Sequence, residues 1–335
     1  MTDGPTDHSP HELQDTAQPG GPAPSGLGFH SRINNLSSGR HGLRAGWRIL
    51  VYFALVAAID LALGMVSAPF LRGYSLERLP TWFFLVSEAE LLVAAFGAGF
   101  IMSRIEQRQF ACYGLPGREA FGKLFWLGAV WGLAAITVLL LVMHAAGAFE
   151  FGGLALHGSR MAKYGAYWGV TFLTVGFTEE FIMRGYSQFT LTQGMGFWPA
   201  AVLLSLAFGG IHLSNHGEVW VGALGASSIG LFFCLTLRRT GTLWFAVGFH
   251  AAWDWGESYL YSVPDSGEIS AGHLLNSSFH GPAWLTGGTV GPEGSVLVFV
   301  LIALLFLAFS AAYREVKYHP EGEAALPTTS NVPSM

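Results

Sequence analysis

Three charged residues lie within six positions of the apolar stretch GFTEEFIMRGY (176–186), where charge is costly. Residues four apart share a helix face, so Glu180 and Arg184 can form a charge-assisted pair. Glu179 is turned by about 100° from Glu180 and has no partner within the helix. The spacing predicts a bracing pair, Glu180 with Arg184, and a free carboxyl, Glu179, that suits a general base or acid.

Two further motifs place histidines in apolar stretches. In FGGIH, Phe208 and His212 share a helix face, and the two glycines between them allow a second helix or a substrate backbone to approach. In HAAWD, His250 and Asp254 are also four apart. A carboxylate at that spacing can fix the tautomer of the histidine, or both groups can face a reacting group.

Each motif alone is as easily structural as functional, because an intramembrane histidine or ion pair often joins two helices. Two glutamates, two histidines and an aspartate on three apolar segments are tolerated together only if they share a polar cavity. A cavity that holds carboxylates, imidazoles and water provides what metal-assisted or carboxylate-based hydrolysis requires.

The helices that must position these residues follow from composition. The chain has 335 residues, of which 51% are hydrophobic and 12% charged, about half the charged share of a soluble domain. We therefore expect an all-α, polytopic membrane helix bundle with an intramembrane polar cavity. A span needs about 20 mostly apolar residues, which gives about eight transmembrane helices, roughly at 46–70, 82–103, 123–147, 164–185, 199–215, 219–237, 243–260 and 295–313.

The flanks of these stretches predict how the chain is organised. Lys and Arg gather in the segments on the same side as the N-terminus, which predicts that both termini are cytoplasmic. Residues 1–40 are expected to be a disordered cytoplasmic tail, 41–318 the transmembrane domain and 319–335 a flexible C-terminal tail. The expected location is a bacterial inner, or plasma, membrane.

Other features exclude functions or stay unassigned. The net charge of −5 and the lack of a basic run argue against nucleic-acid binding. Cys112 and Cys234 are not expected to pair, and they form no metal motif. Asp60, Glu88 and Glu90 are intramembrane acids without an assigned partner; Glu88 and Glu90 lie about 200° apart and cannot both face one cavity.

The order of the three motifs resembles that of the CPBP intramembrane proteases, which include the type II CAAX prenyl endopeptidases and the bacterial Abi proteins. That pattern is EExxxR, then FxxxH, then HxxxN or HxxxD on successive membrane helices. The matching residues here are Glu179-Glu180-Phe181-Ile182-Met183-Arg184, Phe208-Gly209-Gly210-Ile211-His212 and His250-Ala251-Ala252-Trp253-Asp254. The resemblance covers residues 164–260.

The resemblance implies an endopeptidase that cleaves a peptide or membrane-protein substrate within the lipid bilayer. Glu179 would activate the attacking water, and His212 and His250 would hold that water or polarise the substrate carbonyl. Glu180 and Arg184 would brace the helix, with Phe208 as a structural member of the second motif.

The last motif position departs from the prenyl endopeptidases, in which it is often Asn. Asp254 stands there, and an ionised carboxylate cannot donate a hydrogen bond to an oxyanion. Asp254 must then be protonated, orient His250 or help to bind a metal. If a metal is used, Glu179, His212 and His250 form an acceptable zinc set with an open position for water; the same groups suit a metal-free mechanism.

Three other functions compete with this one. A rhomboid-like serine protease would use Ser227 or Ser228 of GASS with His250, but it leaves the glutamate pair unexplained. Small residues in GALGASSIG are more typical of close helix packing than of catalysis. Buried acids and histidines also build proton-coupled transporters, although no inverted repeat is visible. A non-proteolytic immunity or scaffold protein of the same family is the remaining alternative.

Overall fold

The computed structural model describes residues 38–39, 42–72, 74, 81–215, 217–268 and 271–318. Its contacts divide the chain into two units, residues 1–44 and 45–335. The described part of the first unit is a short antiparallel pairing of β1 (Ser38–Gly39) with β2 (Gly42–Leu43). Apart from β1, the two predicted tails lie outside the described residues.

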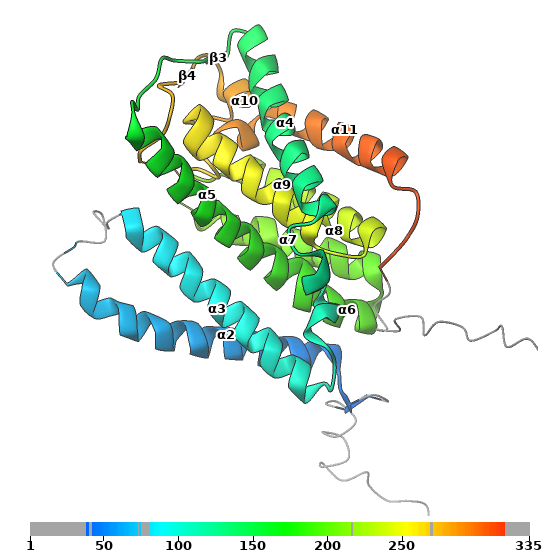
Figure 1. Cartoon of the computed structure of the whole chain (residues 1–335). Helices are drawn as coiled ribbons and strands as arrows, with labels where there is room; N and C mark the ends of the chain where they lie inside the picture. Colours follow the sequence, from blue (N-terminus) through cyan, green and yellow to red (C-terminus); the bar gives the residue numbers. More distant parts are fainter. Residues whose placement is uncertain are drawn as a thin grey trace, which may run out of the picture. The chain divides into compact units, whose positions relative to one another are not determined.

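The second unit is built almost entirely of helices, which confirms the predicted all-α class (Figure 1). Its α-helices are α2 (Ala45–Ser67), α3 (Thr81–Ile105), α4 (Lys123–Ala145), α5 (Ser159–Glu180), α6 (Gln188–Met195), α7 (Phe197–His212), α8 (Trp220–Thr240), α9 (Trp244–Trp255), α10 (Ala283–Thr286) and α11 (Val296–Ala312). Short 3₁₀ turns are η1 (Ala68–Leu71), η3 (Phe110–Tyr113), η4 (Gly117–Glu119) and η7 (Pro292–Gly294). The pair β3 (Phe149–Glu150) and β4 (Ser278–Phe279) is antiparallel.

Each predicted membrane stretch coincides with a helix of this unit. Four helical segments are long and apolar enough to cross a membrane: Ala45–Leu71, Thr81–Ile105, Lys123–Ala145 and Trp220–Thr240. Two shorter apolar helices are Phe197–His212 and Val296–Ala312. Many large apolar side chains on these helices are exposed, as expected for surfaces that face lipid. The chain is an integral membrane protein, and the count of eight spans stays a prediction.

Both helices that carry acidic motif residues change to π-helical form directly after those residues. α5 ends at Glu180 and continues through the π-helix η5 (Phe181–Ser187) into α6. α9 contains Asp254 and continues into the π-helix η6 (Gly256–Tyr261). Single π turns are frequent at functional sites, because they shift the side chains on either side around the helix.

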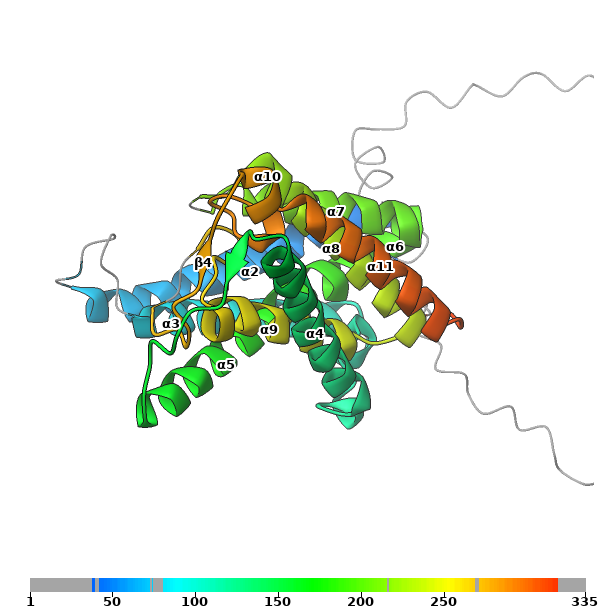
Figure 2. The same cartoon turned by 90° about the horizontal axis from the view of Figure 1, so that it is seen from above.

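Close backbone contacts through glycine fix α9, the helix of His250. α4 lies against α9 in both views (Figures 1 and 2). A Cβ on Gly128 would lie 2.1 Å from the carbonyl oxygen of Phe245, and one on Gly132 would lie 2.2 Å from that of Phe249. From the other side, a Cβ on Gly248 would lie 2.1 Å from the carbonyl oxygen of Phe125. Only glycine allows two helices to approach this closely.

Close contacts through glycine also join α5 to α9 and α7 to α8. A Cβ on Gly176 would lie 3.2 Å from the carbonyl oxygen of Val247, one turn before the glutamate pair. A Cβ on Gly209 of FGGIH would lie 2.1 Å from the carbonyl oxygen of Ala223 in α8. The expected close packing at FGGIH and GALGASSIG is therefore present. Close backbone contact therefore joins α5 to α9, which carry the first and third motifs, and joins α7, which carries the second, to α8.

Candidate active site

The motif residues come from three helical segments that these contacts bring together. Glu179 and Glu180 end α5, and Arg184 lies in η5; Phe208 and His212 lie in α7, and His250 and Asp254 lie in α9.

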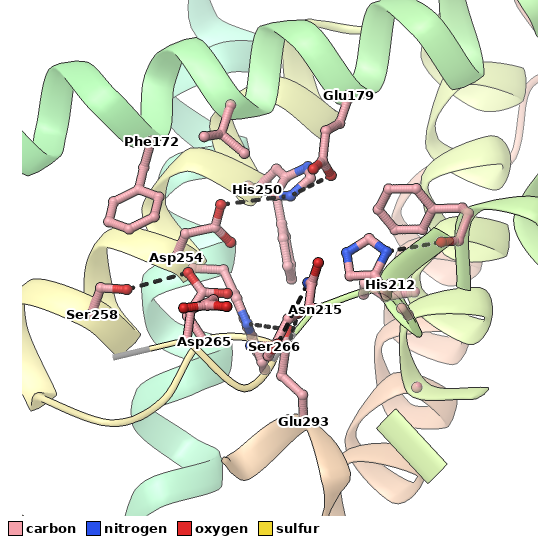
Figure 3. A pocket seen from close by; sticks show the side chains of 18 of the residues that line it. Phe172, Glu179, His212, Asn215, His250, Asp254, Ser258, Asp265, Ser266 and Glu293 are labelled. Carbon is pink, nitrogen blue, oxygen red and sulfur yellow. Dashed lines mark hydrogen bonds and ion pairs between the residues drawn. The ribbon is translucent and has the colours of Figure 1, made fainter. Parts of the chain in front are cut away.

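A cavity of about 220 Å³ lies between these helices. It is lined by Glu179, His212, His250 and Asp254, the four residues predicted to be catalytic. Figure 3 shows Glu179 and Asp254 on opposite sides of the His250 ring, with His212 on the same side as Glu179. This is the polar cavity among apolar helices that the sequence predicted.

His250 is the centre of the polar contacts. Its Nδ1 lies 3.0 Å from Oε1 of Glu180, within hydrogen-bond distance. Its Nε2 lies 3.6 Å from Oε2 of Glu179 and 3.6 Å from Oδ2 of Asp254. The Phe233 ring stacks on the imidazole, with centroids 5.6 Å apart. The ring is therefore held from one edge, and two carboxyl groups face its other nitrogen.

Glu180 and Arg184 form the predicted pair, with Arg184 Nη1 3.1 Å from Glu180 Oε1 and both side chains fully buried. The guanidinium lies 4.2 Å from the centroid of the Phe208 ring, so Phe208 also holds Arg184. The same oxygen of Glu180 faces Nδ1 of His250. A carboxylate only accepts hydrogen bonds, so Nδ1 carries the proton and Nε2 faces the cavity. Glu180 is thus more than a brace, because it also fixes the tautomer of His250.

His212 has a matching orientation. Its Nδ1 lies 2.8 Å from the carbonyl oxygen of Phe208, one turn earlier in α7. A carbonyl only accepts, so Nδ1 donates and Nε2 is left with its lone pair. The Phe208 ring packs against the imidazole edge-on, with centroids 4.5 Å apart. The two histidines are therefore fixed in the same tautomer, by a backbone carbonyl in one case and a carboxylate in the other.

Glu179 differs from Glu180 as the spacing predicted. About a third of its side chain is exposed, whereas Glu180 is fully buried. Its Oε2 accepts no hydrogen bond. Glu179 is thus the cavity carboxyl that stands next to an imidazole without being held by a structural partner.

A comparison with protein-family models gives one match, to the type II CAAX prenyl endopeptidase Rce1-like family, over residues 161–256. Residues 161–256 belong to this family. The match spans all three motifs, and at the family level the function is that of a CAAX-protease-like endopeptidase in a membrane. A search of curated proteins and a search of solved structures found no match.

Asp254 departs from the Asn that is common in prenyl endopeptidases of this family. Its carboxyl is almost fully buried and faces Nε2 of His250, and Glu180 occupies Nδ1. Asp254 therefore does not orient the ring through Nδ1, one of the roles that the sequence left open. Asp254 is placed to contact a group that binds in the cavity next to His250 Nε2.

The donor types of the Rce1-like site suit zinc, but their spacing does not. Zinc ligands at about 2.0–2.2 Å from the ion lie within about 3.6 Å of one another in a tetrahedral site. Among the described residues, only one group of three acidic, histidine or cysteine ligand atoms lies within 4.8 Å of one another, and Glu179, His212 and His250 are not that group. In this arrangement, Glu179, His212 and His250 do not form a zinc site.

The serine alternative gains no support from the contacts. Ser227 Oγ donates to the carbonyl oxygen of Ala223, and Ser228 Oγ to that of Leu224. Within the described residues, no hydrogen bond joins either hydroxyl to His250. Both serines act as small residues within α8, which is the packing interpretation.

Sequence reasoning missed the loop residues that close one end of the cavity. Asn215 follows α7, and Asp265, Ser266 and Glu293 come from the segment between α9 and α11; Figure 3 shows them below Asp254 and His250. Burial raises the pKa of the Asp265 carboxyl well above its usual range, and the nearby carboxylates of Asp254 and Glu293 raise it further. The available signal was the presence of acidic residues in the loop between α9 and α11.

One of the unassigned intramembrane acids also reaches the cavity. Glu88 of α3 lines it, whereas Glu90 and Asp60 do not. The expected divergence of Glu88 and Glu90 around the helix is thus present. Glu88 extends the polar lining toward α3, beyond the segment that matches the family.

Proposed function

We propose that this protein is an intramembrane endopeptidase that hydrolyses a peptide bond with a water activated by Glu179. One observation carries the proposal: Glu179, His212 and His250 line one cavity, and the Nε2 of each histidine is left free by a bond at Nδ1. The motif residues Glu179, Phe208, His212, His250 and Asp254 line the cavity, whereas Glu180 and Arg184 do not.

Glu179 is suited to be the general base. Its unpartnered Oε2 lies 3.6 Å from His250 Nε2, too far for a direct hydrogen bond. Two atoms at that separation can each lie about 2.8 Å from one water oxygen. The carboxylate would take a proton from that water as its oxygen attacks the substrate carbonyl, and would later give the proton to the leaving amine.

The histidines would orient the water and the carbonyl. With its proton on Nδ1, a neutral imidazole presents a lone pair at Nε2 and accepts a hydrogen bond from the water. Protonated at Nε2 as well, it donates to the oxygen that becomes negative. Glu180, ionised beside Arg184, would stabilise that imidazolium through Nδ1.

Asp254 would serve as a neutral donor to the developing oxyanion. Its position beside His250 Nε2 supports this role, because an Asn in the same place donates through its amide. The substrate would be a peptide or membrane protein whose apolar segment enters among Phe172, Val175, Ile229 and Ile302. The bias of Lys and Arg supports cytoplasmic termini in a bacterial inner membrane.

The test uses the full chain in proteoliposomes with a pool of internally quenched peptides, half of them C-terminally prenylated. Glu179→Gln should lower kcat/KM by about 10³-fold or more, since general-base catalysis contributes about 10²–10⁴-fold. Glu90→Gln removes another intramembrane carboxyl, one outside the cavity, and is the matched control; it should stay within about twofold of the parent. Full activity in Glu179→Gln contradicts the proposal, and so does a correctly folded parent that cleaves no peptide.

The metal-free mechanism is tested separately with 1,10-phenanthroline, which binds zinc. We expect unchanged activity and less than about 0.1 zinc per chain by elemental analysis, because the three candidate ligands are too far apart. Loss of activity that added zinc restores would show that the ligands close around a metal.

A further inference from the structure

Three carboxyl groups meet at the loop end of the cavity, outside the three family motifs. Ligand oxygens of Glu257, Asp265 and Glu293 all lie within 4.8 Å of one another. Glu257 belongs to η6 at the end of α9, Asp265 to the segment that follows, and Glu293 to η7 before α11. Three separate segments therefore bring their acids to one point.

The cluster contains a buried carboxyl with no partner. Glu257 is fully buried, and neither of its side-chain oxygens accepts a hydrogen bond. Burying a carboxyl group without a donor is strongly unfavourable. A Glu257 oxygen lies within 4.8 Å of ligand oxygens of Asp265 and Glu293, so the carboxyl without a donor is part of the cluster itself.

The other two acids are held by donors. Trp253 Nε1 donates to Glu293 Oε1, and the backbone N–H and hydroxyl of Ser266 both donate to Glu293 Oε2. Ser258 Oγ donates to Asp265 Oδ2. Glu293 thus accepts three hydrogen bonds and Asp265 one. None of the ion pairs found within the described ranges includes any of the three acids, so no cationic side chain pairs with the cluster.

We propose that Glu257, Asp265 and Glu293 form a calcium site. Oxygen-only ligands suit a hard cation, and the two free oxygens of Glu257 allow the bidentate binding that Ca²⁺ takes readily. Mg²⁺ requires near-ideal octahedral geometry and keeps several waters, which suits a tight, buried cluster less well. The ion fixes the end of α9 to the two segments that carry Asp265 and Glu293, both of which line the cavity.

The test uses the purified full chain in detergent at neutral pH, after dialysis against a calcium chelator. Added Ca²⁺ should bind at one site per chain, with a Kd of about 10⁻⁴–10⁻³ M, the range of extracellular calcium modules. At 100 times the Kd, it should raise Tm by about 5 °C. Mg²⁺ at the same concentration should raise Tm much less. Neither readout needs peptidase activity, so the result is independent of the proposed function.

Terbium gives a positional readout, because Trp253 donates directly to Glu293. Tb³⁺ in the site should luminesce on excitation of tryptophan, and Ca²⁺ should displace it. Trp253→Phe should remove the luminescence and keep the calcium-dependent rise in Tm. Glu257→Gln should remove both, whereas Glu268→Gln, which removes an acid from the same cavity lining, should keep both.

Two results overturn the proposal. One is a parent protein whose Tm and binding heat do not respond to Ca²⁺ at up to about 100 mM, which is 100 times the weakest expected Kd; that result would mean that protons alone neutralise the acids. The other is a calcium response that persists in Glu257→Gln and in Asp265→Asn. If Glu257→Gln does not fold, Asp265→Asn and the parent titration still decide the question.

Discussion

The Glu180–Arg184 pair should contribute several kcal/mol to stability, separately from any role in catalysis. Both side chains are fully buried, 3.1 Å apart. Removing one partner of such a pair leaves an uncompensated buried charge, which costs about 3–5 kcal/mol. At about 2–4 °C per kcal/mol, Glu180→Gln and Arg184→Met should each lower Tm by about 6–20 °C.

The double variant separates the charge from the contact. Replacing both members of a buried ion pair by uncharged residues is often close to neutral, so Glu180→Gln with Arg184→Met should regain most of the lost stability. It should remain inactive, because His250 Nδ1 no longer faces a carboxylate. Glu179→Gln, at a site about one third exposed, should leave Tm within about 1 °C of the parent.

The measurement is intrinsic tryptophan fluorescence during heating, in one detergent and at one scan rate. A single substitution that costs less than about 1 kcal/mol, or two effects that simply add, would contradict this expectation. Additive effects would mean that the two charges are stabilised by other groups, and the assignment of Glu180 as the partner of Arg184 would be wrong.

Three more outcomes follow from contacts described above. Gly132→Ala places a methyl group 2.2 Å from the Phe249 carbonyl oxygen and should cost about 1–3 kcal/mol in thermal unfolding, whereas Gly64→Ala, in open space, should cost nothing. Asp254→Asn should keep at least about a tenth of the peptidase activity and Asp254→Ala should lose about 10²–10³-fold; an inactive Asn variant would show that a carboxyl is needed. Burial raises the pKa of the Cys112 thiol to about 11 from 9.0, so alkylation at pH 7.5, followed by mass spectrometry, should be about a hundredfold slower than for a free thiol and rise tenfold per pH unit. Rapid labelling at neutral pH would contradict it.

Local spacing predicted what lies within one helix. The i,i+4 rule places Glu180 against Arg184 and turns Glu179 away from both, and the structure has this arrangement. The turn of about 100° per residue places Glu88 and Glu90 on different sides of α3, and only Glu88 lines the cavity. These relations depend only on 3.6 residues per turn, which the sequence determines once a helix is predicted.

Contacts between distant segments could not be predicted in the same way. Glu180 and His250 are 70 residues apart, and their contact depends on how α5 packs against α9. The π turns after Glu180 and Trp255 change the helix periodicity, so spacing rules no longer hold beyond them. Glu257 lies in the second π turn, and its partners Asp265 and Glu293 lie in irregular segments.

The glycine contacts between α4 and α9 have a consequence for any shortened form of this protein. The family match begins at residue 161, after α4 has ended. A fragment cut at that boundary would keep every motif residue but would expose Gly248 and the backbone around Phe245 and Phe249 to lipid or detergent. The smallest autonomous peptidase unit therefore extends upstream to at least residue 123, and a transplant of the motif segment into another scaffold must bring α4 with it.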